Sequence, residues 1–353
     1  MQLENVSGST HKLSIGGIVM KNRFSLIGVF LSVFICGMLL MWSGPAFAQD
    51  PMVIKLGLTA AEGTPEVVAS HEFAKILAKN SNGAMRCDVL AGGLAGGERD
   101  IVEGQQLGTI QLSVVSGIVQ NFDRAMMILE YEFLFKNEDH VKKVFYGPIG
   151  EKINQRLIDK AKLRMLSIFM RTPRLLTTRK PVNSIEDLKG MKIRVPEMPA
   201  RVALWKAMGA SPTPLAFPEV FTALQLGTID GQENPIGLIY SARFYEVVKY
   251  LALTNHVYGF MLLTASEDWY QSLTPEQKGW IDKSAKEAAM FNDKYVKETE
   301  ADFMQKVTAH MTVTRPDIGP FREATKDVHK QFANVDGFEE LYSAIVEAGE
   351  EYK

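Results

Sequence analysis

A helical pattern without a breaking residue runs from Pro275 to about His310, and it constrains the fold more than any other stretch of the chain. A helix of about 35 residues would be about 50 Å long at a rise of about 1.5 Å per residue. Most single domains are smaller than this, so we expect the helix to lie across two domains. Its mixed charges, such as Lys283 and Glu287, fit a solvated face better than a partner-binding stripe.

The rest of the chain alternates short extended runs with helical runs. Extended patterns occupy 53–58, 85–90, 110–115, 164–169, 191–195, 212–215, 250–254 and 259–266. Helical patterns occupy 66–80, 98–107, 140–161, 200–208, 219–226 and two stretches between 321 and 352. This alternation predicts an α/β fold. The chain is also long enough for two domains of ordinary size.

The N-terminus has the pattern of a secretory signal peptide. A basic start at Lys21 precedes an unbroken apolar run at 24–42, and an A-x-A box follows at 46–48. We therefore predict a signal peptide over residues 1–48, cleaved at that box. The alternative is an uncleaved membrane anchor, since the apolar run approaches the length of a bilayer span. The small-residue box and the polar residues after it favour cleavage.

Charge and cysteine content narrow the function classes. Without residues 1–48 the chain holds 36 basic and 40 acidic residues, a net charge of −4. This balance argues against a nucleic-acid surface, so we expect no nucleic-acid partner. Cys87 is the only cysteine left, so an exported chain must be held together by its core rather than by an intramolecular disulfide.

Motifs for catalysis are absent from the sequence. The five histidines after residue 48 are scattered, and none has the H-E-x-x-H spacing of a zinc site. No G-x-S-x-G occurs, and Cys87 lies in an extended run where a packed small residue is the better interpretation. The glycine-rich segment 91–100 lacks both phosphate-loop spacings, so a turn leading into a helix is favoured. We expect no enzyme activity, no cofactor and no metal.

Arg174, Arg194 and Asn234 are candidates for holding an anion, because two fixed cations and an amide lie twenty and forty residues apart. Arg194 ends an extended run and is followed by Pro196, which would place its guanidinium at the end of a rigid element. Arginine can hold a carboxylate through two parallel charge-assisted hydrogen bonds. From the residues alone, a surface ion pair is an equally good interpretation of Arg194.

Four ordered segments resemble a known family. They read DLKGMKIRVP at 187–196, GASPTP at 209–214, EVFTALQ at 219–225 and DGQENP at 230–235. Together they are similar to the DctP-type solute-binding proteins of tripartite ATP-independent periplasmic (TRAP) transporters. The resemblance implies a two-domain periplasmic-binding-protein-like α/β fold with hinge strands, a long helix spanning both domains and a cleft that closes on one ligand.

The resemblance also implies domain boundaries. Domain I would comprise 49–171 and 260–299, and domain II would comprise 172–259 and 300–353. The helix at about 275–310 would span both.

Site residues follow from the same motifs. The family's K-x-R-V-P arginine, here Arg194, pairs with the ligand carboxylate, and Arg174 would assist it. Asn234 would hydrogen-bond the ligand, and Phe217 matches an aromatic residue that packs on it. Ser116, which opens a loop at the end of the extended run 110–115, would line the pocket.

One departure bears on the ligand. Relatives that bind sialic acid carry Glu and Arg where this chain has Ser116 and Val119. The difference argues against sialic acid and favours a smaller or less polar acid.

The implied function is transport. Such a protein would work in the periplasm, bind an organic acid such as a C4-dicarboxylate or a sugar acid, and deliver it to a small DctQ-type and a large DctM-type membrane subunit. An alternative is an extracytoplasmic sensor that presents the acid to a signalling receptor.

Overall fold

The computed structural model describes residues 50–352, and two separate β-sheets organise this part of the chain. The predicted signal peptide, residues 1–48, lies outside the described residues. Within residues 50–352, no helix combines the length and the apolar character that crossing a bilayer requires.

The first sheet has five strands in the order β2-β1-β3-β10-β4. They are β1 (Met52–Gly57), β2 (Met85–Leu90), β3 (Leu112–Val115), β4 (Leu163–Met170) and β10 (Phe260–Ser266). Strand β1 is parallel to β2 and β3, whereas β10 lies antiparallel between β3 and β4. Strand β10 therefore belongs to a sheet whose other strands precede it by about a hundred residues or more.

The second sheet has six strands in the order β11-β9-β5-β8-β6-β7. They are β5 (Arg174–Thr178), β6 (Lys192–Val195), β7 (Ser211–Pro214), β8 (Gly231–Pro235), β9 (Tyr250–Ala252) and β11 (Thr312–Thr314). Strand β5 is antiparallel to its neighbours β8 and β9, and β6 is parallel to β7 and β8.

Helices surround both sheets. They are α2 (Pro65–Asn80), α3 (Glu98–Gln106), α4 (Glu138–Phe145), α5 (Pro148–Arg156), α6 (Pro199–Ala207), α7 (Val220–Leu226), α8 (Ile236–Ser241), α9 (Glu267–Ser272), α10 (Pro275–Thr308), α11 (Gly319–Thr325) and α12 (Phe338–Ala348). Short 3-10 helices η1 (Gly117–Asn121) and η2 (Arg124–Glu130) follow β3. The predicted α/β class is confirmed.

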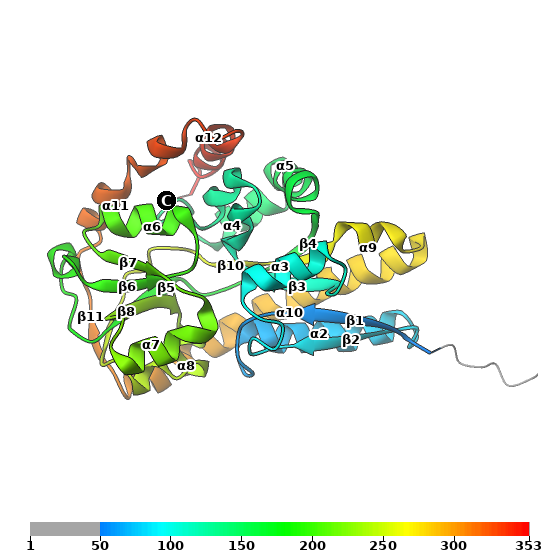
Figure 1. The fold of residues 1–353 in the computed structure, drawn as a ribbon, viewed down its shortest axis with the longest axis horizontal. Helices are drawn as coiled ribbons and strands as arrows, with labels where there is room; N and C mark the ends of the chain where they lie inside the picture. The colour runs from blue at the N-terminus through cyan, green and yellow to red at the C-terminus, as the bar shows by residue number, and fades with distance from the viewer. Residues whose placement is uncertain (1–49, 353) are drawn as a thin grey trace, which may run out of the picture. The chain divides into compact units, whose positions relative to one another are not determined.

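Helix α10 belongs to the cores of both sheets. It begins at a capping box, in which the Thr274 hydroxyl accepts from the Gln277 backbone N–H at 3.2 Å while the Gln277 side chain accepts from the Thr274 N–H at 2.9 Å. Ile281 lies in the apolar cluster beneath the first sheet, whereas Phe303 lies in a cluster of the second. Figure 1 shows the helix passing from the strands β1–β4 to α8 on the other side.

Two short connections also join the sheets. Residues 171–173 link β4 to β5, and residues 253–259 link β9 to β10. The two connections are hydrogen-bonded to each other, because Arg171 N donates to Gly259 O at 3.0 Å and Arg174 N donates to Val257 O at 2.9 Å. They form a paired crossing between the two sheets.

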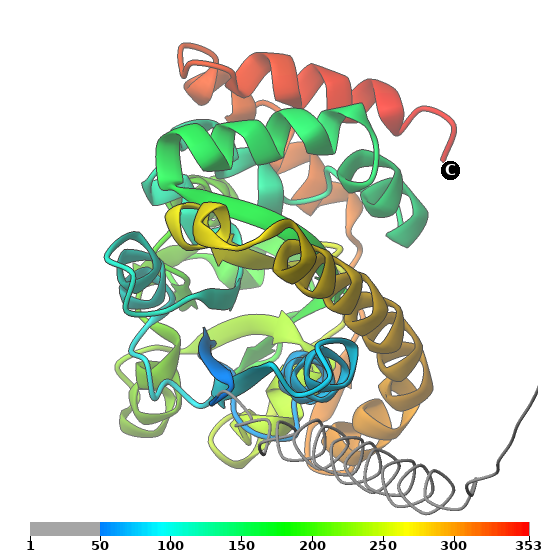
Figure 2. The same cartoon turned by 90° about the vertical axis from the view of Figure 1, so that its right-hand side faces the viewer.

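The last helix, α12, returns to the side of the first sheet. Figure 2 shows α12 (red) beside α5 (green), and these helices are in contact. Phe338, Leu341 and Ile345 share one apolar cluster with Val141 and Ile153 of α4 and α5. The domain boundaries expected from the sequence stay a prediction.

Candidate functional site

The five residues predicted for ligand binding converge on one cavity between the ends of the two sheets. Ser116 lies on the side of the first sheet, and Arg174, Arg194, Phe217 and Asn234 lie on the side of the second. The cavity has a volume of about 50 Å³.

Strand alternation brings Arg194 and Asn234 to the same face of the second sheet. In β6, Ile193 and Val195 point into an apolar cluster, so Arg194 between them points the other way. Arg194 is directly opposite Gln232 of β8, and Asn234 lies two residues further along that strand. Cross-strand partners and residues two apart share a face of the sheet.

The Arg194 guanidinium is buried without a carboxylate partner. It is 3% exposed, and Nε and Nη2 donate to the backbone oxygen of Leu215 at 2.9 and 2.6 Å. Among residues 50–352, no carboxylate oxygen lies within 4.0 Å of it. Burial lowers the pKa of Arg194 to about 10, so the side chain stays cationic at neutral pH. Its Cζ lies 5.8 Å from the centre of the Phe217 ring.

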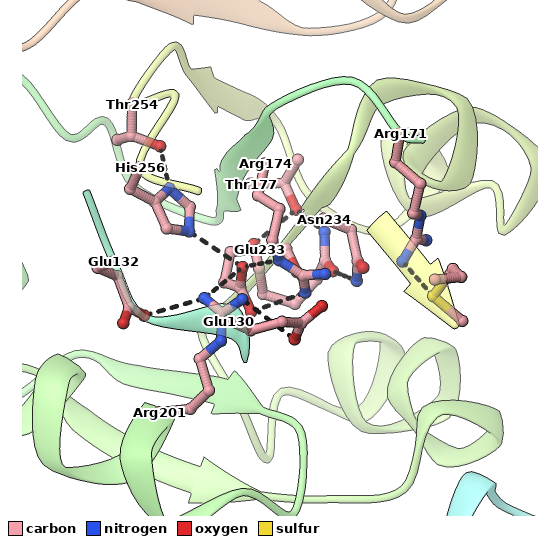
Figure 3. Close-up of polar contacts among 12 residues, drawn as sticks. Glu130, Glu132, Arg171, Arg174, Thr177, Arg201, Glu233, Asn234, Thr254 and His256 are labelled. Carbon is pink, nitrogen blue, oxygen red and sulfur yellow. Dashed lines mark hydrogen bonds and ion pairs between the residues drawn. The ribbon is translucent and has the colours of Figure 1, made fainter. Parts of the chain in front are cut away.

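Arg174, in contrast, is neutralised by Glu233. Nε donates to Glu233 Oε2, and Nη2 donates to Oε1 at 2.9 Å and to the backbone oxygen at 2.8 Å (Figure 3). His256 Nε2 lies 3.0 Å from the same carboxylate. Burial alone would raise the pKa of Glu233, but the charges of Arg174 and Arg201 hold it well below its usual range. Arg174 therefore adds hydrogen-bond donors to the cavity without a net charge.

A chain of side chains fixes the Asn234 amide. Asn234 Nδ2 donates to Gln232 Oε1 at 2.5 Å, and Gln232 Nε2 donates to Thr177 Oγ1 at 2.7 Å. All three residues lie on one face of the β5–β8 pair. The second Nδ2 hydrogen of Asn234 stays available to a ligand.

The Ser116 hydroxyl is committed to a neighbouring acid. Ser116 Oγ donates to Glu98 Oε2 at 2.5 Å, and the Ser116 backbone N–H donates to the same oxygen at 3.3 Å. Glu98 is the first residue of α3, and it also lines the cavity. Desolvation raises the pKa of the Glu98 carboxyl, with the Ser116 hydrogen bonds acting in the opposite direction.

A buried ion pair forms another part of the cavity wall. Arg171 follows β4, and its Nη2 lies 2.9 Å from Oε1 of Glu66 in the first turn of α2. Both residues are less than a tenth exposed, at 8% and 2%. Arg171 Nη1 donates to the sulfur of Met261 at 3.1 Å, the contact drawn beside Arg171 in Figure 3.

Behind the cavity, Arg201 of α6 joins three acids. Its side chain is fully buried and pairs with Glu132 at 2.9 Å, with Glu130 at 3.3 Å and with Glu233 at 3.5 Å (Figure 3). Burial raises the pKa of Glu132 to about 7 despite the opposing charge of Arg201. This network connects α6 of the second sheet to the segment that follows η2.

The glycine-rich segment 91–97 also approaches the second sheet. A Cβ atom on Gly93 would lie 3.2 Å from Cγ of Pro218, and Gly93 has a positive φ of +78°. Gly97 is the N-cap of α3, and its N–H donates to the Asp100 side chain at 2.8 Å. The segment is thus a turn into a helix, as the sequence predicts, and it serves as a contact between the two sides of the cavity.

Metal and thiol chemistry find no support in the described part of the chain. No group of His, Cys, Asp and Glu in residues 50–352 is arranged to hold a metal ion. Burial raises the pKa of the Cys87 thiol to about 12, which keeps it protonated and unreactive.

Comparison with known proteins identifies the family. The sequence profile of the bacterial extracellular solute-binding proteins, family 7 (DctP), matches residues 56–336. The chain belongs to this family. Members of it are solute-binding proteins rather than enzymes.

Three relatives illustrate the similarity. A solute-binding protein of Roseobacter denitrificans is 38% identical over 286 residues, which cover 81% of this chain and 88% of the relative. Its crystal structure with bound L-galactonate superimposes with a TM-score of 0.81 at 36% identity, covering 85% of this chain and 99% of that one.

The sialic acid-binding periplasmic protein SiaP of Vibrio cholerae is 31% identical, covering 83% of this chain and 92% of its own. The sugar acid binding protein of Advenella mimigardefordensis in complex with galactonate has a TM-score of 0.81 at 27% identity, covering 85% of this chain and 98% of that one. The two-domain fold expected from the family resemblance is thereby confirmed.

Sequence reasoning missed four charged cavity residues of this solute-binding protein: Glu66, Glu98, Arg171 and Glu197. Glu66 and Arg171 come from segments a hundred residues apart, and no motif connects them. Glu98 follows the glycine-rich segment, where only its position in the first turn of a helix is visible in the sequence. The roles of the five predicted residues stay predictions.

Proposed function

We propose that this protein captures a sugar acid in the periplasm by its carboxylate and delivers it to the membrane subunits of a TRAP transporter. The single observation that carries the proposal is the Arg194 guanidinium, which is 3% exposed and has no carboxylate within 4.0 Å among the described residues. Burying an unpaired cation is unfavourable unless an anion binds beside it. A carboxylate ligand supplies that anion.

The other predicted residues have separate roles in this proposal. Arg174 and Asn234 donate further hydrogen bonds to the carboxylate, and Phe217 packs against the ligand. Ser116 orients the Glu98 carboxyl towards the cavity. The sugar acid class is supported by the galactonate bound to the relatives from Roseobacter denitrificans and Advenella mimigardefordensis.

The proposal also covers the location of the protein, its membrane partners and the closure of its two domains on the ligand. The predicted signal peptide and the family support export to the periplasm, and the family supports a small DctQ-type and a large DctM-type membrane partner. The paired connections 171–173 and 253–259 would act as the hinge between domain I and domain II, with the boundaries expected from the sequence. Ligand binding would then shift the population towards the closed form.

Calorimetric titration with galactonate of the mature wild-type protein and of its Arg194→Ala variant tests the proposal. Removing one partner of a desolvated charge pair costs about 2–5 kcal/mol, so we expect the affinity to fall about 30-fold or more. Unfolding of the ligand-free variant should need at least as much free energy as unfolding of the wild type, because the substitution removes an unpaired buried cation.

Arg243→Ala is the matched control. Arg243 is at the surface, where its side chain is 67% exposed and pairs with Glu246. Its removal should leave the affinity within a factor of about 2, since exposed ion pairs contribute little. Near-normal binding by Arg194→Ala, or a loss of equal size in Arg243→Ala, would contradict the proposal.

A further inference from the structure

The charges around the cavity leave one arginine for an anionic ligand. Of the three arginines that line the cavity, Arg174 pairs with Glu233 and Arg171 pairs with Glu66. Arg194 alone has no carboxylate within 4.0 Å among residues 50–352. Glu98 and Glu197 also line the cavity, so a second ligand carboxylate would meet further carboxyl groups and no unpaired arginine.

The Arg171–Glu66 pair has unused hydrogen-bonding capacity although it is buried. Arg171 Nε has no hydrogen-bond partner among the described residues. Glu66 Oε1 lies close to Arg171 Nη2 but makes no aligned hydrogen bond. Buried polar atoms are nearly always satisfied in folded proteins, so these two atoms are the exceptions in the wall of the cavity.

A hydroxyl group has the hydrogen-bonding chemistry that both atoms require. It can donate to Glu66 Oε1 and accept from Arg171 Nε, whereas a carboxylate can only accept and a protonated amine can only donate. A second carboxylate at this position would face the Glu66 carboxylate at close range. A protonated amine would face the arginines of the cavity. Glu98 adds another acceptor to the same cavity, since Ser116 donates only to its Oε2.

We propose that Glu66 and Arg171, assisted by Glu98, form a hydroxyl-recognition subsite that restricts the ligand to polyhydroxylated monocarboxylates and rejects dicarboxylates. The inference rests on the proposed capture of an acid by Arg194. It assigns specificity among organic acids to a part of the cavity that is separate from Arg194, the anchor for the ligand carboxylate.

Calorimetry with three matched probes tests the subsite. Galactonate has one carboxylate and a hydroxylated chain, galactarate has the same chain with a second carboxylate, and hexanoate has one carboxylate and no hydroxyls. We expect galactarate and hexanoate each to bind about 100-fold more weakly than galactonate, because like charges across an interface and unpaired buried polar groups are both costly.

Glu66→Gln should change this preference. Without the Glu66 carboxylate, Arg171 becomes an unpaired cation that can take the second carboxylate of galactarate. We expect the galactarate-to-galactonate ratio of dissociation constants to fall about 10-fold or more. Glu72→Gln is the control, because Glu72 lies on the same helix in a partly exposed pair with Lys75 at 3.3 Å. It should leave the ratio unchanged.

A double variant tests the subsite even if Glu66→Gln folds poorly. Glu66→Leu with Arg171→Met replaces the buried ion pair by apolar side chains of similar length, an exchange that folded proteins often tolerate. Galactonate affinity should fall about 30-fold or more, while hexanoate affinity should hold or improve.

The outcomes separate the two proposals. Equal affinity of the wild type for galactonate and galactarate, with both lost in Arg194→Ala, would overturn the subsite and leave the anchor standing. A double variant that still prefers galactonate over hexanoate as the wild type does would also overturn the subsite. Failure of all three acids to bind the wild type would overturn both proposals.

Discussion

Glu132 is a carboxyl group that folding places among other charges with no access to water. It is fully buried as a side chain, pairs with Arg201 at 2.9 Å, and has one oxygen without a hydrogen-bond partner among the described residues. Burial raises its pKa from 4.5 to about 7. Between these two pH values, Glu132 is protonated in the folded protein and ionised in the unfolded chain. The stabilisation by that proton is complete below about pH 4.5 and is lost as the pH rises through about 7.

Glu132→Gln should remove this pH dependence. The amide resembles the protonated acid, so we expect the variant to match the wild type near pH 5 and to exceed its unfolding free energy by about 1–3 kcal/mol near pH 8. Urea unfolding at both pH values measures the difference. Glu103→Gln, at an exposed pair with Arg99, should stay within about 0.5 kcal/mol of the wild type at both. A variant that is less stable than the wild type at pH 8 would show that the ionised carboxylate is the favoured form.

Two glycines of the segment 91–97 allow the effect of backbone strain to be distinguished from the effect of a contact across the cavity. Gly92 and Gly93 both have positive φ values, +67° and +78°. An added Cβ would meet nothing within 4 Å at Gly92 but would lie 3.2 Å from Pro218 at Gly93. Pro218 belongs to the loop that also carries Phe217, which packs against the cores of both sheets.

Alanine substitutions at these two glycines should therefore differ in binding. Both Gly92→Ala and Gly93→Ala should lower the unfolding free energy by about 1 kcal/mol, because alanine disfavours a positive φ. Only Gly93→Ala should weaken galactonate binding, by about 3- to 10-fold, because only its methyl group would crowd Pro218 on the other side of the cavity. Chemical unfolding and calorimetry measure the two effects separately. Equal affinities in the two variants would show that the contact with Pro218 does not contribute to closure.

Some helices, strands and site residues could be predicted from the sequence, and others could not. Helix α10 was visible because its pattern is local, and the Thr274 cap lies three residues from its Gln277 partner. Strand β5 was not predicted, because its polar end gives no apolar alternation and its position depends on pairing with β8 and β9. Arg194 and Asn234 were found through motifs. The Arg171–Glu66 pair was missed because only the folded chain brings α2 next to the end of β4.

Hydrogen bonds and the buried Arg201 ion-pair network join the two sides of the cavity. Gln120 Oε1 accepts from the Ala200 N–H at 3.1 Å, and Asn121 Nδ2 donates to the Glu197 oxygen at 2.9 Å. These contacts join η1, which follows the first sheet, to the start of α6 beside the second. Each neutral hydrogen bond contributes about 0.5–1.5 kcal/mol. Opening of the cavity would have to break such contacts, and a ligand bound to both sides would favour the closed form further.

Small-angle X-ray scattering of the mature protein tests this closure. We expect galactonate to lower the radius of gyration towards about 19 Å, the value for a compact chain of about 300 residues. The physical reason is that Arg194 lies on the side of the second sheet and Glu66 on the side of the first, so a ligand that contacts both is bound best by the closed form. Arg194→Ala at the same galactonate concentration should keep the larger radius, whereas Arg243→Ala should contract like the wild type. An unchanged radius in wild-type protein that calorimetry shows to be saturated would contradict the hinge at residues 171–173 and 253–259.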